Sequence, residues 1–148
     1  MPVQFELVTP EQLLVSRDVD MVVVPGTEGN FGVLPGHSPL ISTIRPGTID
    51  IYEGNAITER FFVASGLAEV TPEGCTVLAD EAVPPDSLDR AQLEAELQIL
   101  DGNMPSLRDQ IGRVTGTDRD HLLAELRQLE RQFAVTSAKL RVLRELGG

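Results

Sequence analysis

The stretch that decides the fold of this 148-residue chain is Val24-Pro25-Gly26-Thr27-Glu28-Gly29-Asn30-Phe31-Gly32-Val33-Leu34-Pro35-Gly36-His37-Ser38-Pro39. It directly follows a strand-like run and interrupts hydrophobic residues with proline and glycine at short intervals. Proline fixes φ and lacks a backbone donor, whereas glycine permits positive φ, so this backbone takes a specific irregular shape and cannot continue as a helix. Apolar residues exposed on a shaped loop usually meet a partner surface. The stretch therefore predicts a docking protein.

Residues 1–85, which surround this stretch, show the pattern of β-structure. Two strand-like runs, 48–52 and 57–65, flank a turn signal that contains glycine. A second pair of runs, 67–70 and 75–79, flanks another such turn. Short strands at close spacing predict an N-terminal β-sandwich or small barrel, in which antiparallel hairpins dominate.

Residues 86–148 show the longer period of helices. Asp86 or Ser87 is placed to cap a first helix, and the segment Asp101-Gly102-Asn103 is expected to end it. Residues 101–118 contain three glycines and one proline, which predicts an extended loop with at most one short helical turn at 106–111. The second domain is therefore expected to be a helical hairpin with a long connection.

The last predicted helix carries an apolar seam. From residue 118 to residue 146 the chain has neither glycine nor proline. Spacings of four and three alternate through Leu122, Leu126, Leu129, Phe133, Thr136, Leu140 and Leu143. A repeat of 3.5 residues is the pattern of a helix that packs along another helix.

Charge is distributed unevenly along the chain. The net charge is −11, which excludes a surface built for nucleic acid or for anionic lipid. Residues 119–148 nevertheless hold six basic and four acidic groups, so an acidic protein surface is the natural target of the last helix. No stretch approaches the roughly 18 apolar residues of a membrane span, and no secretory signal is expected at the N-terminus.

Groups that could carry chemistry are few and scattered. His37, His121 and Cys75 have no metal-ligand spacing, and no Gly-Lys-Ser/Thr loop for phosphate is present. His37 lacks a motif that would supply a nucleophile, so it is expected to hydrogen-bond the backbone of its turn. Cys75 is expected to be a small buried residue of a strand, and His121 a solvated one. A hydrolase that uses His37 is the weakest functional hypothesis.

Several segments, in order from about residue 5 to residue 89, resemble the epsilon subunit of F-type ATP synthases: Leu7-Val8-Thr9-Pro10-Glu11, Val24-Pro25-Gly26-Thr27-Glu28-Gly29, Gly32-Val33-Leu34-Pro35-Gly36-His37-Ser38-Pro39-Leu40, Arg45-Pro46-Gly47, Phe62-Val63-Ala64-Ser65-Gly66-Leu67-Ala68-Glu69-Val70 and Thr76-Val77-Leu78-Ala79-Asp80. The resemblance implies a sandwich of about ten strands followed by a helical hairpin. It also implies a non-catalytic rotor subunit of the F1 complex that binds the gamma subunit, touches the c-ring and restrains ATP hydrolysis at the catalytic alpha/beta head. Its expected position is peripheral, at the cytoplasmic face of a bacterial plasma membrane, without insertion. The alternative that the residues leave open is a stand-alone adaptor with the same architecture.

The resemblance also assigns candidate residues. The segment Glu28-Gly29-Asn30-Phe31-Gly32 resembles the sandwich loop that faces the ring, and His37 matches the histidine of the Pro-Gly-His turn. Asn30 stands where relatives often carry an acid. Candidate inhibitory contacts, which are equally well read as a solvated face, are Arg127, Arg131, Lys139, Arg141 and Arg144. Some members bind ATP at the start of the first helix, but here no basic residue follows Arg90 in the predicted helix, so no cofactor is expected.

Overall fold

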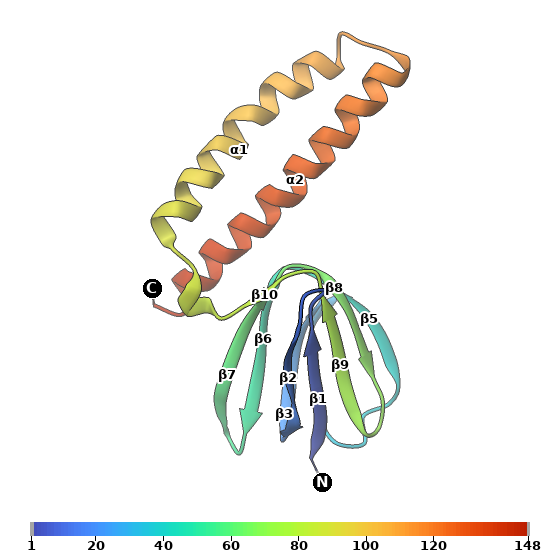
Figure 1. Ribbon diagram of the computed structural model, residues 1–148, viewed down its shortest axis with the longest axis vertical. Coiled ribbons are helices and arrows are strands. Elements are labelled where there is room, and N and C mark those ends of the chain that lie inside the picture. Colours follow the sequence, from blue (N-terminus) through green and yellow to red (C-terminus); the bar gives the residue numbers. More distant parts are fainter. Residues whose placement is uncertain (1, 148) are drawn as a thin grey trace. The chain divides into compact units, whose positions relative to one another are not determined.

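The computed structural model describes residues 2–147, which form two compact units, Met1–Ser87 and Leu88–Gly148 (Figure 1). Met1 and Gly148, the outer bounds of the two predicted domains, lie outside the described residues. The strands are β1 (Val3–Val8), β2 (Leu13–Val19), β3 (Met21–Gly26), β4 (Gly29–Val33), β5 (Leu40–Ile44), β6 (Gly47–Glu53), β7 (Ala56–Val63), β8 (Gly66–Val70), β9 (Gly74–Ala79) and β10 (Ala82–Val83). A short 3₁₀ turn, η1 (Pro85–Ser87), precedes the helices α1 (Arg90–Ile111) and α2 (Gly116–Glu145).

The first unit is a ten-stranded sheet that curls into two layers, which confirms the predicted sandwich. The strand order is β10-β7-β6-β3-β5-β8-β9-β1-β2, and β4 pairs with β3 off this path. The layers are joined where β3 meets β5, and this junction consists of one residue pair, Gly26 and Ile44. Pairing is antiparallel except between β1 and β9, which run parallel.

Alternating side chains explain why these segments form strands with a shared interior. In β1, Val3, Phe5 and Leu7 are almost fully buried, whereas Gln4 between them is exposed. Such alternation places every second side chain on the inner face of a sheet. The core that results is aliphatic and aromatic, and its largest fully buried members are Phe5, Leu7, Ile49 and Ile51.

A polar network on the surface ties distant strands of the sandwich together. Arg17 in β2 donates from Nε to Glu53 at 3.3 Å and from Nη2 to Glu59 at 2.8 Å. The hydrogen bond to Glu59 is the main cause that raises the pKa of Arg17. Because all three side chains are exposed to solvent, the network contributes modestly to stability, at most about 1 kcal/mol per pair.

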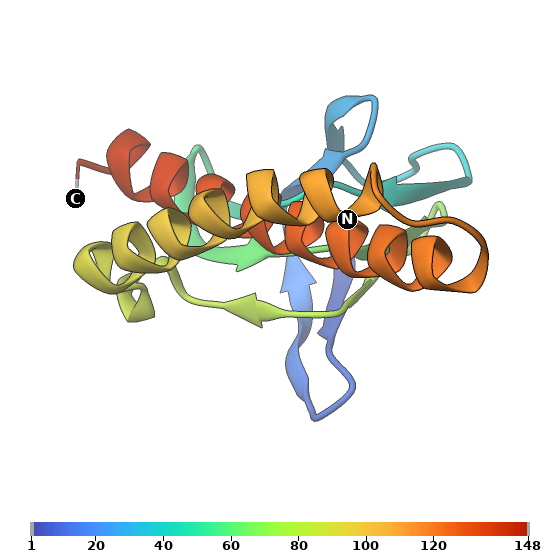
Figure 2. The same ribbon diagram turned by 90° about the horizontal axis from the view of Figure 1, so that it is seen from above.

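The helical unit is a hairpin in which α1 and α2 lie side by side and run in opposite directions (Figures 1 and 2). The N-cap of α1 is Asp89, whose carboxylate accepts from the amide of Gln92 at 3.2 Å. The predicted caps Asp86 and Ser87 belong to η1 instead, where the Ser87 hydroxyl donates to the carbonyl of Pro84 at 2.7 Å. The predicted helical hairpin is thus confirmed, with its first cap shifted.

The predicted extended loop at residues 101–118 is wrong. Helix α1 continues through Gly102 and Pro105 to Ile111, and only residues 112–115 connect it to α2. The reason is a second apolar seam with the same four-and-three spacing, formed by Leu93, Leu97, Leu100, Met104, Leu107 and Ile111. Five of these six side chains are buried, and their burial outweighs the intrinsic preferences of the helix breakers.

Pro105 is the weakest point of α1. It removes the amide that would bond to the carbonyl of Asp101, and its ring crowds that carbonyl. Its side chain is exposed, so alanine at this position removes no core contact. We therefore expect Pro105→Ala to stabilise α1 by as much as about 3 kcal/mol. Native-state hydrogen exchange of the amides of residues 101–111 measures this gain.

A matched control is the exposed neighbour Ser106. Ser106→Ala improves helix propensity by only about 0.5 kcal/mol and leaves the proline in place. Equal protection of the α1 amides in the two variants would contradict the assignment of Pro105 as the weak point.

Candidate functional site

The stretch at residues 24–39 folds as a β-hairpin followed by a turn. Strands β3 and β4 pair from Val22 opposite Val33 to Gly26 opposite Gly29, so the tip consists of Thr27 and Glu28. The prediction that residues 28–32 form a loop is therefore wrong in its local structure, since Gly29 to Val33 are strand residues. The periodicity of the sequence gave no signal for strand β4, because two glycines interrupt the apolar alternation of this short strand.

The tip of this hairpin is attached to the start of the neighbouring β5–β6 connection. The amide of Thr27 donates to the carbonyl of Thr43 at 3.1 Å, and their hydroxyls lie 2.9 Å apart. The amide of Arg45 donates to the carbonyl of Pro25 at 3.0 Å, and its guanidinium donates to the side-chain oxygen of Asn30. The tip is thus a fixed projection with exposed residues at Glu28, Gly29 and Asn30.

His37 lies in the turn after β4 and bonds to the backbone, as the sequence predicts. Its Nδ1 lies 2.6 Å from the carbonyl oxygen of Ser38 and therefore donates to it. The turn is closed by the amide of His37 on the carbonyl of Leu34 at 3.1 Å, and the amide of Gly36 donates to Pro72 at 3.0 Å. No hydrogen bond among the described residues joins His37 to residues 28–32, so the structure does not bring these candidates into one site.

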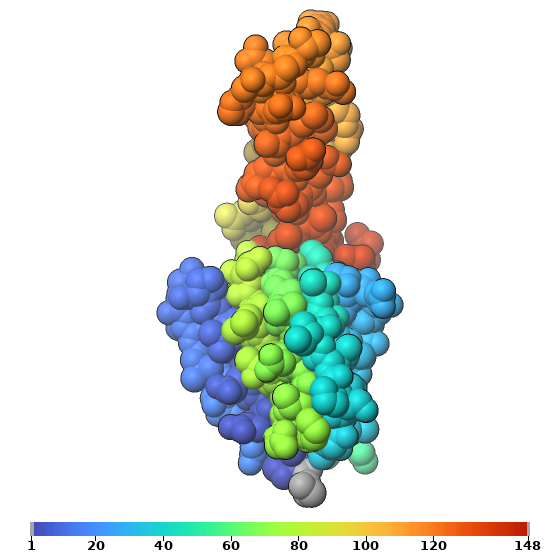
Figure 3. Space-filling model, turned by 90° about the vertical axis from the view of Figure 1, so that its right-hand side faces the viewer, coloured from blue at the N-terminus to red at the C-terminus, as the bar shows by residue number. Residues whose placement is uncertain are grey.

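A second candidate surface is the outer face of β5, β8 and β9, which sequence reasoning missed. Ile41 is 65% exposed, Leu78 is 52% exposed, and Leu67 is also exposed. The pairs Leu67 with Leu78 and Ile41 with Glu69 place these side chains on one face, and Figure 3 shows the three strands side by side there. A hollow of about 130 Å³ lies among Leu67, Glu69, Thr76 and Leu78. We call Ile41, Leu67 and Leu78 the apolar patch.

The sequence holds one weak signal for the apolar patch. Leu67-Ala68 and Val77-Leu78-Ala79 place apolar residues on both faces of a strand. Only the register between strands reveals which member of each run points outward, because alternation alone does not distinguish the two faces.

The cationic residues of α2 do not form one cluster. Arg127, Arg131, Arg141 and Arg144 are exposed, and Lys139 is half-buried. At 3.6 residues per turn, Arg127, Arg131 and Arg141 fall on the side opposite the apolar seam, whereas Lys139 and Arg144 lie nearer to it. Arg131 donates to the side chain of Gln128 at 2.7 Å. Three of the five predicted contacts therefore share a face.

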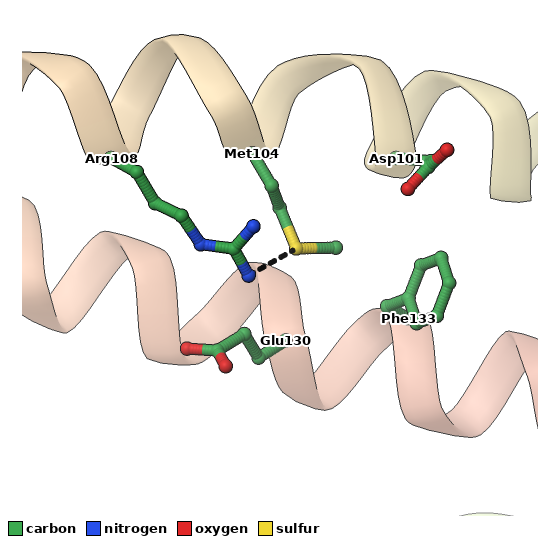
Figure 4. A pocket seen from close by; sticks show the side chains of 5 residues that line it. All are labelled: Asp101, Met104, Arg108, Glu130 and Phe133. Carbon is green, nitrogen blue, oxygen red and sulfur yellow. Dashed lines mark hydrogen bonds between the residues drawn. The ribbon is translucent and has the colours of Figure 1, made fainter.

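A hollow of about 240 Å³ lies between the two helices (Figure 4). Its lining consists of Asp101, Met104, Arg108, Glu130 and Phe133. Arg108 is a basic residue of α1 that the sequence analysis assigned to the predicted loop. One guanidinium beside two carboxylates does not suit a polyphosphate, which needs an excess of cations.

Cys75 and His121 occupy the positions expected of them. Cys75 is 2% exposed in β9, and desolvation raises the pKa of its thiol from 9.0 to about 12. His121 is exposed in α2. Within residues 2–147 no group of three or more His, Cys, Asp or Glu side chains is placed to hold a metal ion. Across the same residues, neither helix has the length and apolarity needed to cross a bilayer.

The fold and the primary sequence define the class of protein. Residues 2–85 match the family described as ATP synthase, Delta/Epsilon chain, beta-sandwich domain. The chain belongs to this family of ATP synthase delta and epsilon chains. Within the family its relatives are epsilon chains, which confirms the resemblance and a non-catalytic subunit.

Two bacterial relatives illustrate the likeness. The ATP synthase epsilon chain of Rhodospirillum centenum is 48% identical over 139 residues, which cover 93% of this chain and 88% of that protein. The epsilon chain of Rhodospirillum rubrum is 54% identical over 101 residues, or 68% of this chain and 75% of that protein. A chain of the Euglena gracilis mitochondrial ATP synthase shares the fold, with a TM-score of 0.62 at 18% identity over 99% of this chain and 79% of that chain.

The buried thiol of Cys75 gives a pH dependence that can be measured. Because its pKa is raised in the folded state, the unfolded chain loses the proton first, and the folded state cannot follow until about pH 12. The free energy of unfolding therefore keeps its full value below pH 9.0, the ordinary pKa of the thiol. Above pH 9.0 it declines by up to about 1.4 kcal/mol per pH unit. Urea unfolding at pH 7, 9 and 10.5 measures the decline.

Cys75→Ala is the control for this pH series. The variant loses some packing at every pH, but it lacks the thiol, so its stability should decline less steeply above pH 9.0. Parallel pH profiles for the two proteins would show that the thiol is not the cause.

Proposed function

We propose that this chain is a non-catalytic subunit of the rotor of a proton-translocating F-type ATP synthase, where it binds gamma and the c-ring and couples their rotation. Membership in the ATP synthase delta/epsilon family supports the proposal. So do the fold neighbours, which come from an OSCP/F1/c-ring assembly and, with a TM-score of 0.50, from a central stalk/c-ring assembly of Tetrahymena thermophila. The proposed location is the cytoplasmic face of the plasma membrane, and the bacterial source of the relatives supports it.

The apolar patch carries the proposal, because it is a surface without a partner in the isolated chain. Ile41, Leu67 and Leu78 expose aliphatic side chains on a flat sheet face, which in a monomer is a mark of protein contact. Gamma is the proposed occupant, since a rotor subunit must be fixed to the shaft by a large dry interface if it is to transmit torque. Glu69 lies beside the patch, in the lining of the hollow, and gives it one charge for orientation.

The hairpin tip is the proposed contact with the c-ring. Glu28, Gly29 and Asn30 are exposed there, and Phe31 and Gly32 follow in β4. Asn30 is neutral, so its contribution is a hydrogen bond rather than an ion pair. A tip with one exposed acid, Glu28, and small or polar neighbours suits a polar loop of a partner.

Helix α2 is the proposed brake on ATP hydrolysis. When α2 leaves α1, its seam is bare and packs on gamma, while Arg127, Arg131 and Arg141 face an acidic strip of the catalytic alpha/beta head. Lys139 and Arg144 flank this face and add to its positive charge. In both positions the seam is buried, and only the surface that covers it changes. The free-energy difference between the two positions is therefore about a few kcal/mol.

The patch is tested by one substitution with a matched control. Ile41→Asp should weaken co-elution with gamma from the same source by roughly thirtyfold, or about 2 kcal/mol, because it places a charge at the centre of a dry interface. Ile99 in α1 is 63% exposed and lies off the seam, so Ile99→Asp should leave binding unchanged. Size-exclusion chromatography and titration calorimetry measure both.

If the folded wild-type chain elutes independently of gamma, the rotor assignment is wrong and a stand-alone adaptor takes its place. If Ile41→Asp binds as tightly as Ile99→Asp, gamma docks elsewhere on the sandwich.

The brake is tested by ATP hydrolysis of the reconstituted catalytic complex. Removal of residues 119–148 should raise hydrolysis several-fold, and removal of 88–148 should do the same without leaving the seam of α1 bare. Arg141→Ala should reproduce part of the effect, whereas Arg119→Ala, an exposed arginine outside the five, should not. Inhibition that survives both truncations would refute the hairpin as the brake.

A further inference from the structure

Arg45 occupies an unusual position beside the hairpin tip. It follows β5 directly, and its backbone amide already bonds to Pro25 at 3.0 Å. Its guanidinium folds back over the chain, since a Cβ built on Gly47 would lie 3.1 Å from Nη1 of Arg45 and 3.1 Å from Cβ of Pro25. From there Nη2 donates to the side-chain oxygen of Asn30. The side chain thus spans from the β5–β6 corner to β4.

The two arms of the hairpin are held differently. The β3 arm is fixed by backbone bonds to the β5 side, through the carbonyl of Pro25 and the amide of Thr27. Strand β4 pairs only with β3 in the described part of the chain. Within residues 2–147, the bond from Arg45 to Asn30 is the one side-chain hydrogen bond on the β4 arm of the tip, and it joins that arm to the β5–β6 corner.

We propose that Arg45 is the positioning residue of the hairpin tip: its guanidinium holds Asn30 and thereby fixes the tip in the shape that docks onto the ring. This inference rests on the proposed function for its partner. Asn30 then has a role that needs no negative charge, because a guanidinium bonds to an amide oxygen as well as to a carboxylate. Arg45 keeps further N–H groups free for acceptor oxygens of the partner loop.

Gly47 provides an independent way to disturb the same contact. Its φ is not in the left-handed region, so alanine is acceptable to the backbone there. A methyl group at this position would crowd both the guanidinium of Arg45 and the ring of Pro25. Gly47→Ala should therefore displace Arg45 from Asn30 without altering any charge.

The first arm of the test uses the isolated full-length chain. Arg45→Gln should raise the exchange rates of the amides of residues 28–32 about tenfold, because the β4 arm loses its hold, while the midpoint of global unfolding changes little. Gly47→Ala should act in the same direction. The control is Arg17→Gln, which removes a second arginine of the sandwich that also donates to side chains, those of Glu53 and Glu59, and it should leave residues 28–32 unaffected.

The second arm measures binding of the same chains to a detergent-solubilised assembly of gamma and the c-ring. Arg45→Gln should weaken binding about tenfold, mostly through faster dissociation, and Arg17→Gln should not. Arg45→Lys keeps the charge but loses the planar fork, so it should also bind weakly. Combining it with Asn30→Asp restores a charge-assisted bond and should recover most of the affinity.

The outcomes separate the two proposals. Faster exchange and weaker binding in Arg45→Gln, with recovery in the double variant, support the positioning role. Faster exchange with unchanged affinity overturns it and leaves Arg45 as a purely structural residue. Identical behaviour of Arg45→Gln and Arg17→Gln in both arms also overturns it. If the wild-type chain does not bind the assembly, the proposed function and the docking part of this inference are overturned. The hydrogen-exchange measurement still tests whether Arg45 fixes the tip.

Discussion

The close approach of backbone at Gly26 is the constraint on which the sandwich depends. A Cβ at this position would lie 2.8 Å from the carbonyl oxygen of Gly29 and 2.9 Å from the ring of Phe31. Gly26 also pairs with Ile44, and in the described part of the chain this is the one residue pair in register between β3 and β5. One residue without a side chain therefore allows the sheet to turn between layers, the hairpin to close and Phe31 to reach the core. The tip and the apolar patch lie on strands that this junction connects.

The sequence predicts the elements that local patterns determine and fails where distant contacts decide. Strand β6 follows from the alternation over residues 48–52, and α2 follows from a seam free of glycine and proline. The residue at which α1 ends does not follow from the sequence, because Gly102 and Pro105 are strong local stop signals. The side chains of Met104, Leu107 and Ile111 override them only once α2 is present to cover the seam. Strand β4 was not predicted for the same reason, since its pairing with β3 determines its conformation.

The candidate surfaces also divide into those that the sequence indicates and those that depend on contacts between distant residues. The assignment of residues 28–32 rests on resemblance and stays a prediction, whereas His37 was correctly expected to bond to the backbone of its turn. The apolar patch was not found, because it depends on the register of three strands that are separated by turns. The hold of Arg45 on Asn30 joins residues fifteen apart and depends on how the β5–β6 corner meets the hairpin. No periodicity or spacing encodes such a contact.

In the proposed rotor role, rotation under load would place opposite demands on the two units, and their composition suits both. On this proposal torque would pass through the sandwich, where an aliphatic core and a tip held from two sides resist deformation. A brake must instead change state at modest cost, so its folded form must not be too stable. Helix α1 includes an exposed proline and an exposed glycine in its second half, and each lowers helix stability by about 1–3 kcal/mol. On the proposed function, that penalty weakens the closed hairpin and makes it easier for a partner surface to compete for the seam of α2.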